Sequence, residues 1–100
     1  MADKKSVVWS SRANLEYTNL IDYLLNNWGL ILTKEVISKI NDSIDRITTS
    51  SEQFPIVSQT KPIRKCVISK QTSIFFISSL EKIFIISLFD NRQNPDKIFT

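Results

Sequence analysis

The strongest constraint on the fold is a change in hydrophobic periodicity near the middle of the chain. In the first half, apolar residues recur every three or four positions, which places them on one face of an α-helix. Two such stripes are present: Tyr17, Leu20, Ile21, Leu24 and Trp28, then Val36, Ile37, Ile40, Ile44 and Ile47. Ser10 or Ser11 can cap the first helix, and Gly29, the only glycine, suits its end. The pattern predicts an αα-hairpin whose stripes face a common floor, with Glu16 on the solvent side.

In the second half, apolar residues follow the two-residue period of β-strands. A short first strand is predicted at 7–9, and three more strands, joined by tight turns, at 63–69, 72–78 and 82–89. Residues 48–62 lack periodicity and contain two prolines, so they are predicted to form a long loop. The expected fold class is therefore α+β. An N-terminal strand is followed by an αα-hairpin that packs on a small antiparallel sheet, and a C-terminal three-stranded meander completes this sheet.

Composition narrows the chemistry that such a fold can support. A chain of 100 residues is expected to form a single domain, 1–100. It contains no histidine and one cysteine, Cys66, which excludes histidine-based nucleophilic catalysis, an internal disulfide and a cysteine zinc site. No cofactor and no metal are expected. The N-terminal apolar run is too short for a signal peptide, and no apolar segment is long enough to span a bilayer. We therefore expect a cytoplasmic protein without a membrane partner.

The predicted sheet is apolar on both faces. In the middle strand Ile74 and Phe76 alternate with Phe75 and Ile77, and in the last strand Ile83 and Ile85 alternate with Phe84, Ile86 and Leu88. A two-helix hairpin covers one face, and a large uncovered apolar face usually marks a partner site. The alternative is that loop 48–62 folds back over the second face. We favour a partner surface, with Phe76, Phe84 and Ile86 as its apolar candidates.

Cations are concentrated in the second half of the chain. Lys61, Arg64, Lys65 and Lys70 lie within ten residues with no acidic residue between them. They can bind a nucleic acid or an acidic protein, or they can simply be a solvated strand edge that prevents aggregation. Arg92, which follows the last strand, can either reach the sheet edge beside Arg64 or pair with a nearby aspartate.

Several segments resemble the RelE/ParE superfamily of type II toxins over nearly the whole chain. The opening 8–13 (VWSSRA) is similar to that family's first motif, and 21–29 (IDYLLNNWG) to its first helix. Phe54-Pro55 resembles its loop, 63–65 (IRK) the start of its second strand, and 90–95 (DNRQNP) its closing motif. The resemblance implies a toxin, often encoded in plasmid stabilization modules, that is neutralised in a hetero-oligomer by a cognate antitoxin.

The resemblance implies one of two activities for the free toxin. RelE-like members cleave messenger RNA on the ribosome with Lys, Arg and a C-terminal tyrosine, whereas ParE-like members inhibit DNA gyrase. Here the only tyrosines, Tyr17 and Tyr23, lie in the first predicted helix, so the proton-transfer group that RNA cleavage needs is missing. We therefore favour a gyrase inhibitor that is not an enzyme. A metal-independent endoribonuclease and an inactive antitoxin-binding module remain the alternatives.

The candidate site residues follow from these alternatives. If the protein is a nuclease, the catalytic candidates are Arg64, Lys65 and Arg92. The residues expected to bind the antitoxin or the target are both cationic and apolar: Lys61, Arg64, Lys65, Phe76, Phe84, Ile86 and Arg92.

Overall fold

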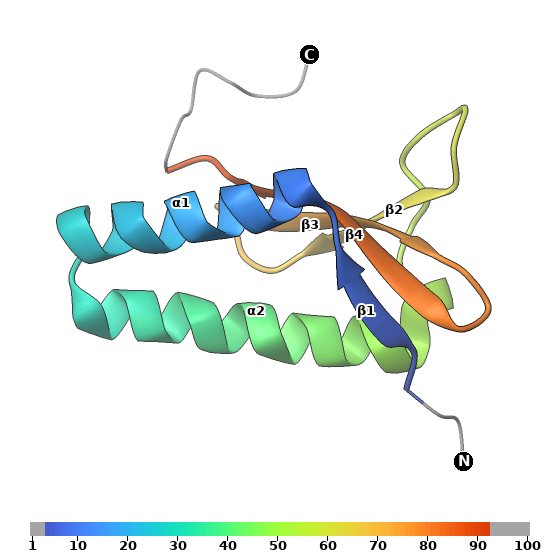
Figure 1. Cartoon of the computed structure of the whole chain (residues 1–100), viewed down its shortest axis with the longest axis horizontal. Helices are drawn as coiled ribbons and strands as arrows, with labels where there is room; N and C mark the ends of the chain where they lie inside the picture. The colour runs from blue at the N-terminus through green and yellow to red at the C-terminus, as the bar shows by residue number, and fades with distance from the viewer. Residues whose placement is uncertain (1–3, 93–100) are drawn as a thin grey trace.

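The computed structural model describes residues 4–92, which form two helices packed on one sheet (Figure 1). In chain order the elements are β1 (Ser6–Trp9), α1 (Ser11–Asn27), α2 (Leu30–Ser50), the 3₁₀ turn η1 (Ser51–Gln53), β2 (Ile63–Val67), β3 (Thr72–Ser78) and β4 (Lys82–Asp90). This is the predicted α+β order. Within residues 4–92, neither helix is long and apolar enough to cross a lipid bilayer.

The two helices begin and end at the residues that local chemistry favours. Ser10 caps α1, because its Oγ accepts a hydrogen bond of 2.9 Å from the amide of Ala13. Gly29 separates α1 from α2 with a φ of 88°, a backbone conformation that favours glycine. The helix α2 extends to Ser50, so the long loop starts later than the predicted residue 48.

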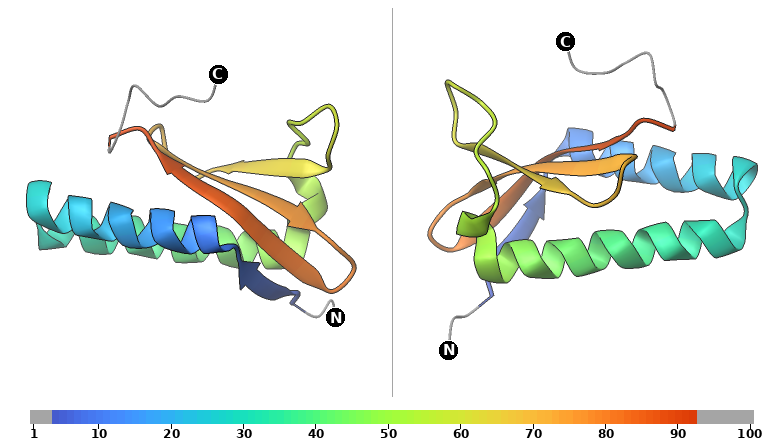
Figure 2. Two further views of the ribbon diagram at one scale, coloured as in Figure 1. Left: turned by 45° about the horizontal axis from the view of Figure 1, so that its top comes forward. Right: turned by 180° about the vertical axis from the view of Figure 1, so that it is seen from behind.

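The sheet is mixed, whereas the sequence predicted an antiparallel one. Its strand order is β1-β4-β3-β2, with β2, β3 and β4 in an antiparallel meander and β1 parallel to β4. The parallel pair follows from the connection. The hairpin α1–α2 returns the chain to the end of the sheet where β1 began, so β2 runs in the direction of β1 (Figure 2). Two further reversals give β4 that same direction.

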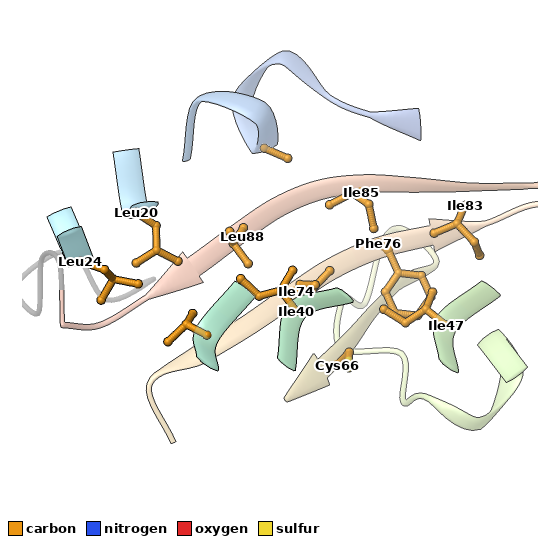
Figure 3. Packing of buried hydrophobic residues seen from close by; sticks show 12 residues of the cluster. Leu20, Leu24, Ile40, Ile47, Cys66, Ile74, Phe76, Ile83, Ile85 and Leu88 are labelled. Carbon is orange, nitrogen blue, oxygen red and sulfur yellow. The ribbon is translucent and has the colours of Figure 1, made fainter. Parts of the chain in front are cut away.

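The hydrophobic core lies between the helix hairpin and one face of the sheet (Figure 3). Leu20 and Leu24 of α1 and Ile40 and Ile47 of α2 are buried there, as their spacing predicts. Their partners from the sheet are also buried: Cys66, Ile74, Phe76, Ile83, Ile85 and Leu88. Trp28 is an exception, because the hairpin turn projects beyond the sheet (Figure 1) and leaves this side chain 52% exposed.

A β-bulge in β4 changes which residues face the core. Phe75 pairs with Ser87 and Phe76 pairs with Ile85, so Ile86 has no partner on β3. The extra residue interrupts the alternation of β4. As a result Leu88 lies in the core with Ile83 and Ile85, and not on the face of Phe84 and Ile86 that simple alternation predicts.

Candidate binding groove on the open sheet face

The sheet face opposite the helices contains a groove of about 640 Å³. Its floor and walls are apolar residues from three strands and the long loop: Val57, Ile63, Phe75, Ile86 and Phe89. Arg12, Lys65 and Lys70 also line the groove, together with the neutral polar side chains of Ser58, Gln71, Ser73, Ser87 and Asn91. No Asp, Glu, His or Tyr belongs to this lining of described residues. The groove therefore joins apolar surface to positive charge.

The alternation of β2 and β3 places the groove residues. Lys65 pairs with Phe75 across the two strands, and its Nζ lies 5.8 Å from the centre of the Phe75 ring. This cation–π contact holds the ammonium group over an aromatic side chain of the groove. The neighbouring pair, Arg64 and Phe76, points to the opposite face of the sheet. Of the predicted site residues, Lys65 and Ile86 line the groove, and Phe84, 39% exposed, belongs to the same face of β4.

Phe76 is not available to a partner, so its prediction as a binding residue is wrong. Its side chain is completely buried, and its ring meets that of Phe54 edge to face with 5.7 Å between the centres. The reason is the alternation of β3, which turns Phe76 with Ile74 toward the helices and Phe75 toward the groove. Lys61 lies in the loop before β2 and is exposed, outside the groove lining.

Arg64 anchors the long loop and does not line the groove. Its Nη1 donates hydrogen bonds to the carbonyl oxygens of Phe54, at 2.6 Å, and Glu52, at 3.4 Å. The chain next to Phe54 then pairs with β2: Val57 N donates to Ile63 O at 2.8 Å, and Lys65 N donates to Pro55 O at 3.0 Å. The loop thus covers the edge of β2, and Val57 forms one wall of the groove. The alternative that loop 48–62 covers the open face is not what the structure shows, because the loop borders this face at Val57 and Ser58 and leaves the groove open.

Arg92 is held by Asp90 at the other end of β3. The guanidinium Nη2 lies 2.8 Å from Asp90 Oδ2, and the same oxygen accepts a hydrogen bond of 2.6 Å from Thr72 Oγ1. The Asp90 side chain is 1% exposed, so this pair is largely withdrawn from water. Arg64 pairs with Phe76, four residues along β3 from Thr72, which corresponds to about 13 Å. The expectation that Arg92 lies beside Arg64 is therefore wrong.

The three nuclease candidates accordingly do not form one cluster. Arg64 points to the helix side, Lys65 points to the groove, and Arg92 is paired near the start of β3. The lone thiol adds no nucleophile, because burial raises the pKa of Cys66 and keeps the thiol protonated. Sequence reasoning missed Arg12, Phe75 and Phe89 as site residues. The alternation of β3 could have identified Phe75, but nothing local shows that Arg12 lies beside β4.

The structure is similar to several solved structures. A chain of the chromosomal ParDE TA system from P. aeruginosa superposes with a TM-score of 0.72 and 15% identity, covering 87% of this chain and 96% of that one. The YoeB dimer from Staphylococcus aureus gives a TM-score of 0.64 and 16% identity, covering 87% and 97%. The conserved hypothetical protein HP0894 from Helicobacter pylori gives 0.59 and 16%, covering 88% and 96%. The chain therefore shares the fold of these solved structures, which is the fold that the resemblance to the RelE/ParE superfamily implies. At the level of sequence, no protein-family model and no curated protein matches.

Proposed function

We propose that this protein is the toxin of a type II toxin-antitoxin pair and that it arrests growth by inhibiting DNA gyrase in the cytoplasm. The fold supports the toxin role, since solved structures with this fold include a chain of a ParDE TA system. The single observation that favours gyrase over messenger RNA is the chemistry of the groove. Its described lining contains three cations and no Asp, Glu, His or Tyr. Such a surface can bind a protein but lacks the general acid and base of a metal-independent nuclease.

We further propose that the antitoxin neutralises the toxin by placing an acidic, apolar segment in the groove. Phe75, Ile86 and Phe89 offer apolar area, and Arg12, Lys65 and Lys70 offer complementary charge. Because apolar burial contributes much of the binding, we expect the complex to survive moderate salt. The association rate should fall with increasing ionic strength, since screening weakens electrostatic steering.

The test is expression of the chain without an antitoxin, followed by assays of the purified protein. We expect growth arrest, inhibition of gyrase supercoiling and intact messenger RNA. Lys65→Ala should weaken the inhibition, whereas Lys34→Ala, which removes an exposed lysine on α2, should leave it unchanged. Cleavage of ribosome-bound messages by the purified protein would identify an endoribonuclease instead. Antitoxin binding without growth arrest would identify an inactive binding module.

A further inference from the structure

The edge of β4 is completed by two different elements. The short strand β1 pairs only with residues 82–85 of β4, and α1 begins where β1 ends and runs beside the remainder (Figure 2). Ser10 Oγ donates a hydrogen bond of 2.8 Å to the carbonyl of the bulged Ile86. Glu16 Oε1 accepts from the amide of Leu88 at 3.0 Å. The side chains of the cap residue Ser10 and of Glu16 in α1 therefore replace the backbone partners that a longer β1 would supply.

Glu16 also connects this edge to the groove. Its Oε1 accepts a second hydrogen bond, of 2.9 Å, from Ser87 Oγ, and its Oε2 accepts one of 3.2 Å from Arg12 Nε. Both Ser87 and Arg12 line the groove. The Glu16 side chain is 27% exposed and that of Arg12 is 61% exposed, so a partly buried carboxylate holds a guanidinium that reaches solvent.

The position of Arg12 is unfavourable for the helix itself. Arg12 is the second residue of α1, where the partial positive charge of the helix N-terminus disfavours a cation. The order Arg12 then Glu16 is also the less favourable arrangement of an i,i+4 ion pair. Helix stability therefore does not account for this pair. Its placement is consistent with a role at the groove, where Arg12 adds positive charge beside Ile86 and Phe89.

We propose that Glu16 is a positioning residue that orients Arg12 over the groove for binding an acidic, apolar segment. This inference rests on the proposed binding role of the groove but not on which cellular target the toxin has. The proposal predicts whether removal of the Glu16 carboxylate strengthens or weakens the binding of an acidic ligand. If only net charge mattered, removal of the Glu16 carboxylate would strengthen binding of an acidic ligand. If Glu16 orients Arg12, the same change weakens binding although the protein becomes more positive.

Glu16→Gln separates these effects with little structural change. The amide oxygen of glutamine can still accept from Ser87 and Leu88, whereas its NH₂ group cannot accept from Arg12 Nε. The probe is a fluorescent peptide of alternating glutamate and leucine, titrated against the full chain, with a glutamine–leucine peptide as the uncharged comparison. We expect Glu16→Gln to bind the acidic peptide about threefold to fivefold more weakly, the range of an exposed ion pair. Asp22→Asn, which removes an exposed carboxylate from the same helix, should not weaken binding.

The second readout is the effect of Glu16→Gln measured in the Arg12→Ala variant. If Glu16 had only a structural role, Glu16→Gln would weaken binding in this variant as well. We expect Glu16→Gln to have no further effect once Arg12 is absent, and both single variants to show a shallower salt dependence for the acidic peptide. Tighter binding by Glu16→Gln, or an equal loss in the Arg12→Ala background, would overturn the proposal, as would a wild-type chain that prefers neither peptide. If Glu16→Gln does not fold, Arg12→Lys serves instead. It keeps the charge but lacks Nε, and wild-type binding by this variant would also overturn the proposal. Growth arrest is scored separately, so failure of the toxin assignment is recognised independently.

Discussion

The two faces of the sheet have similar sequences and different surroundings. On β3, Phe76 is completely buried under the helices, whereas its neighbour Phe75 is half-buried in the groove beside Lys65. Both faces carry isoleucine and phenylalanine, so hydrophobicity alone does not distinguish core from binding surface. The distinction comes from the hairpin, which covers one face, and from the cations, which line the other. A small sheet with apolar residues on both faces therefore indicates a binding surface only when it is known which face the helices cover.

The basic residues show the same division. Arg64 and Arg92 both donate to oxygen atoms of the chain itself, on the loop after η1 and on Asp90. Lys65 and Lys70 instead line the open groove. The adjacent residues Arg64 and Lys65 therefore have different roles. Successive side chains of β2 point to opposite faces of the sheet, so Arg64 holds the loop and Lys65 lines the groove.

The largest expected effect is on the covered face. Phe76→Ala should lower the free energy of unfolding by about 3 to 5 kcal/mol, because it leaves a cavity in the core. Phe75→Ala should cost under about 1.5 kcal/mol, since its ring is half-buried, and should instead weaken binding in the groove. Urea denaturation of the two variants measures the difference. Equal losses of stability would show that the two faces are equally part of the core.

A smaller effect is expected for the adjacent pair Arg64 and Lys65. Arg64→Ala removes the hydrogen bonds that hold the loop at Phe54 and Glu52, which should cost about 1 to 2 kcal/mol. Lys65→Ala should cost under about 1 kcal/mol, the scale of its cation–π contact, and should reduce peptide binding more than Arg64→Ala does. Denaturation and peptide titration together check this. A larger binding loss in Arg64→Ala would place the functional cation on the covered side.

The smallest effect concerns a polar contact at the margin of the covered face. The pKa of Glu52 is lowered, chiefly by a hydrogen bond from its own backbone amide and then by the charge of Lys5, whose Nζ lies 3.7 Å away. A lowered pKa contributes stability above the ordinary pKa of the carboxyl, and this contribution is lost as the pH falls through the folded-state value. Wild type should therefore lose slightly more stability than Glu52→Gln during acidification. Parallel pH profiles of the melting temperature would contradict this.

The helices and the order of helices and strands along the chain could be predicted from the sequence, because they depend on local periodicity. Leu20, Leu24, Ile40 and Ile47 lie in the core as their spacing predicts. Trp28 does not, because the length by which a hairpin extends past its sheet depends on tertiary packing.

The groove was less predictable than the helices. The bulge at Ile86 places Leu88 on the face opposite to the one that simple alternation predicts, and no residue type in β4 indicates a bulge. The contact of Glu16 with β4 joins residues more than 70 positions apart, so the helical pattern alone predicted a solvent-facing side chain. Alternation did separate Phe75 from Phe76, but only the position of the helices shows which face remains open.

The parallel pairing of β1 with β4 has a consequence for the synthesis of the protein. Ser6 pairs with Lys82, so the sheet joins two segments that are far apart in the chain and leave the ribosome at different times. The nascent helix hairpin has no complete apolar floor until β4 emerges, because Ile83, Ile85 and Leu88 supply a large part of it. Contacts between such distant segments also make folding slow. A growing chain that stops before β4 should therefore lack both the core and the groove, so that the synthesis of β4 decides when a binding-competent molecule first exists.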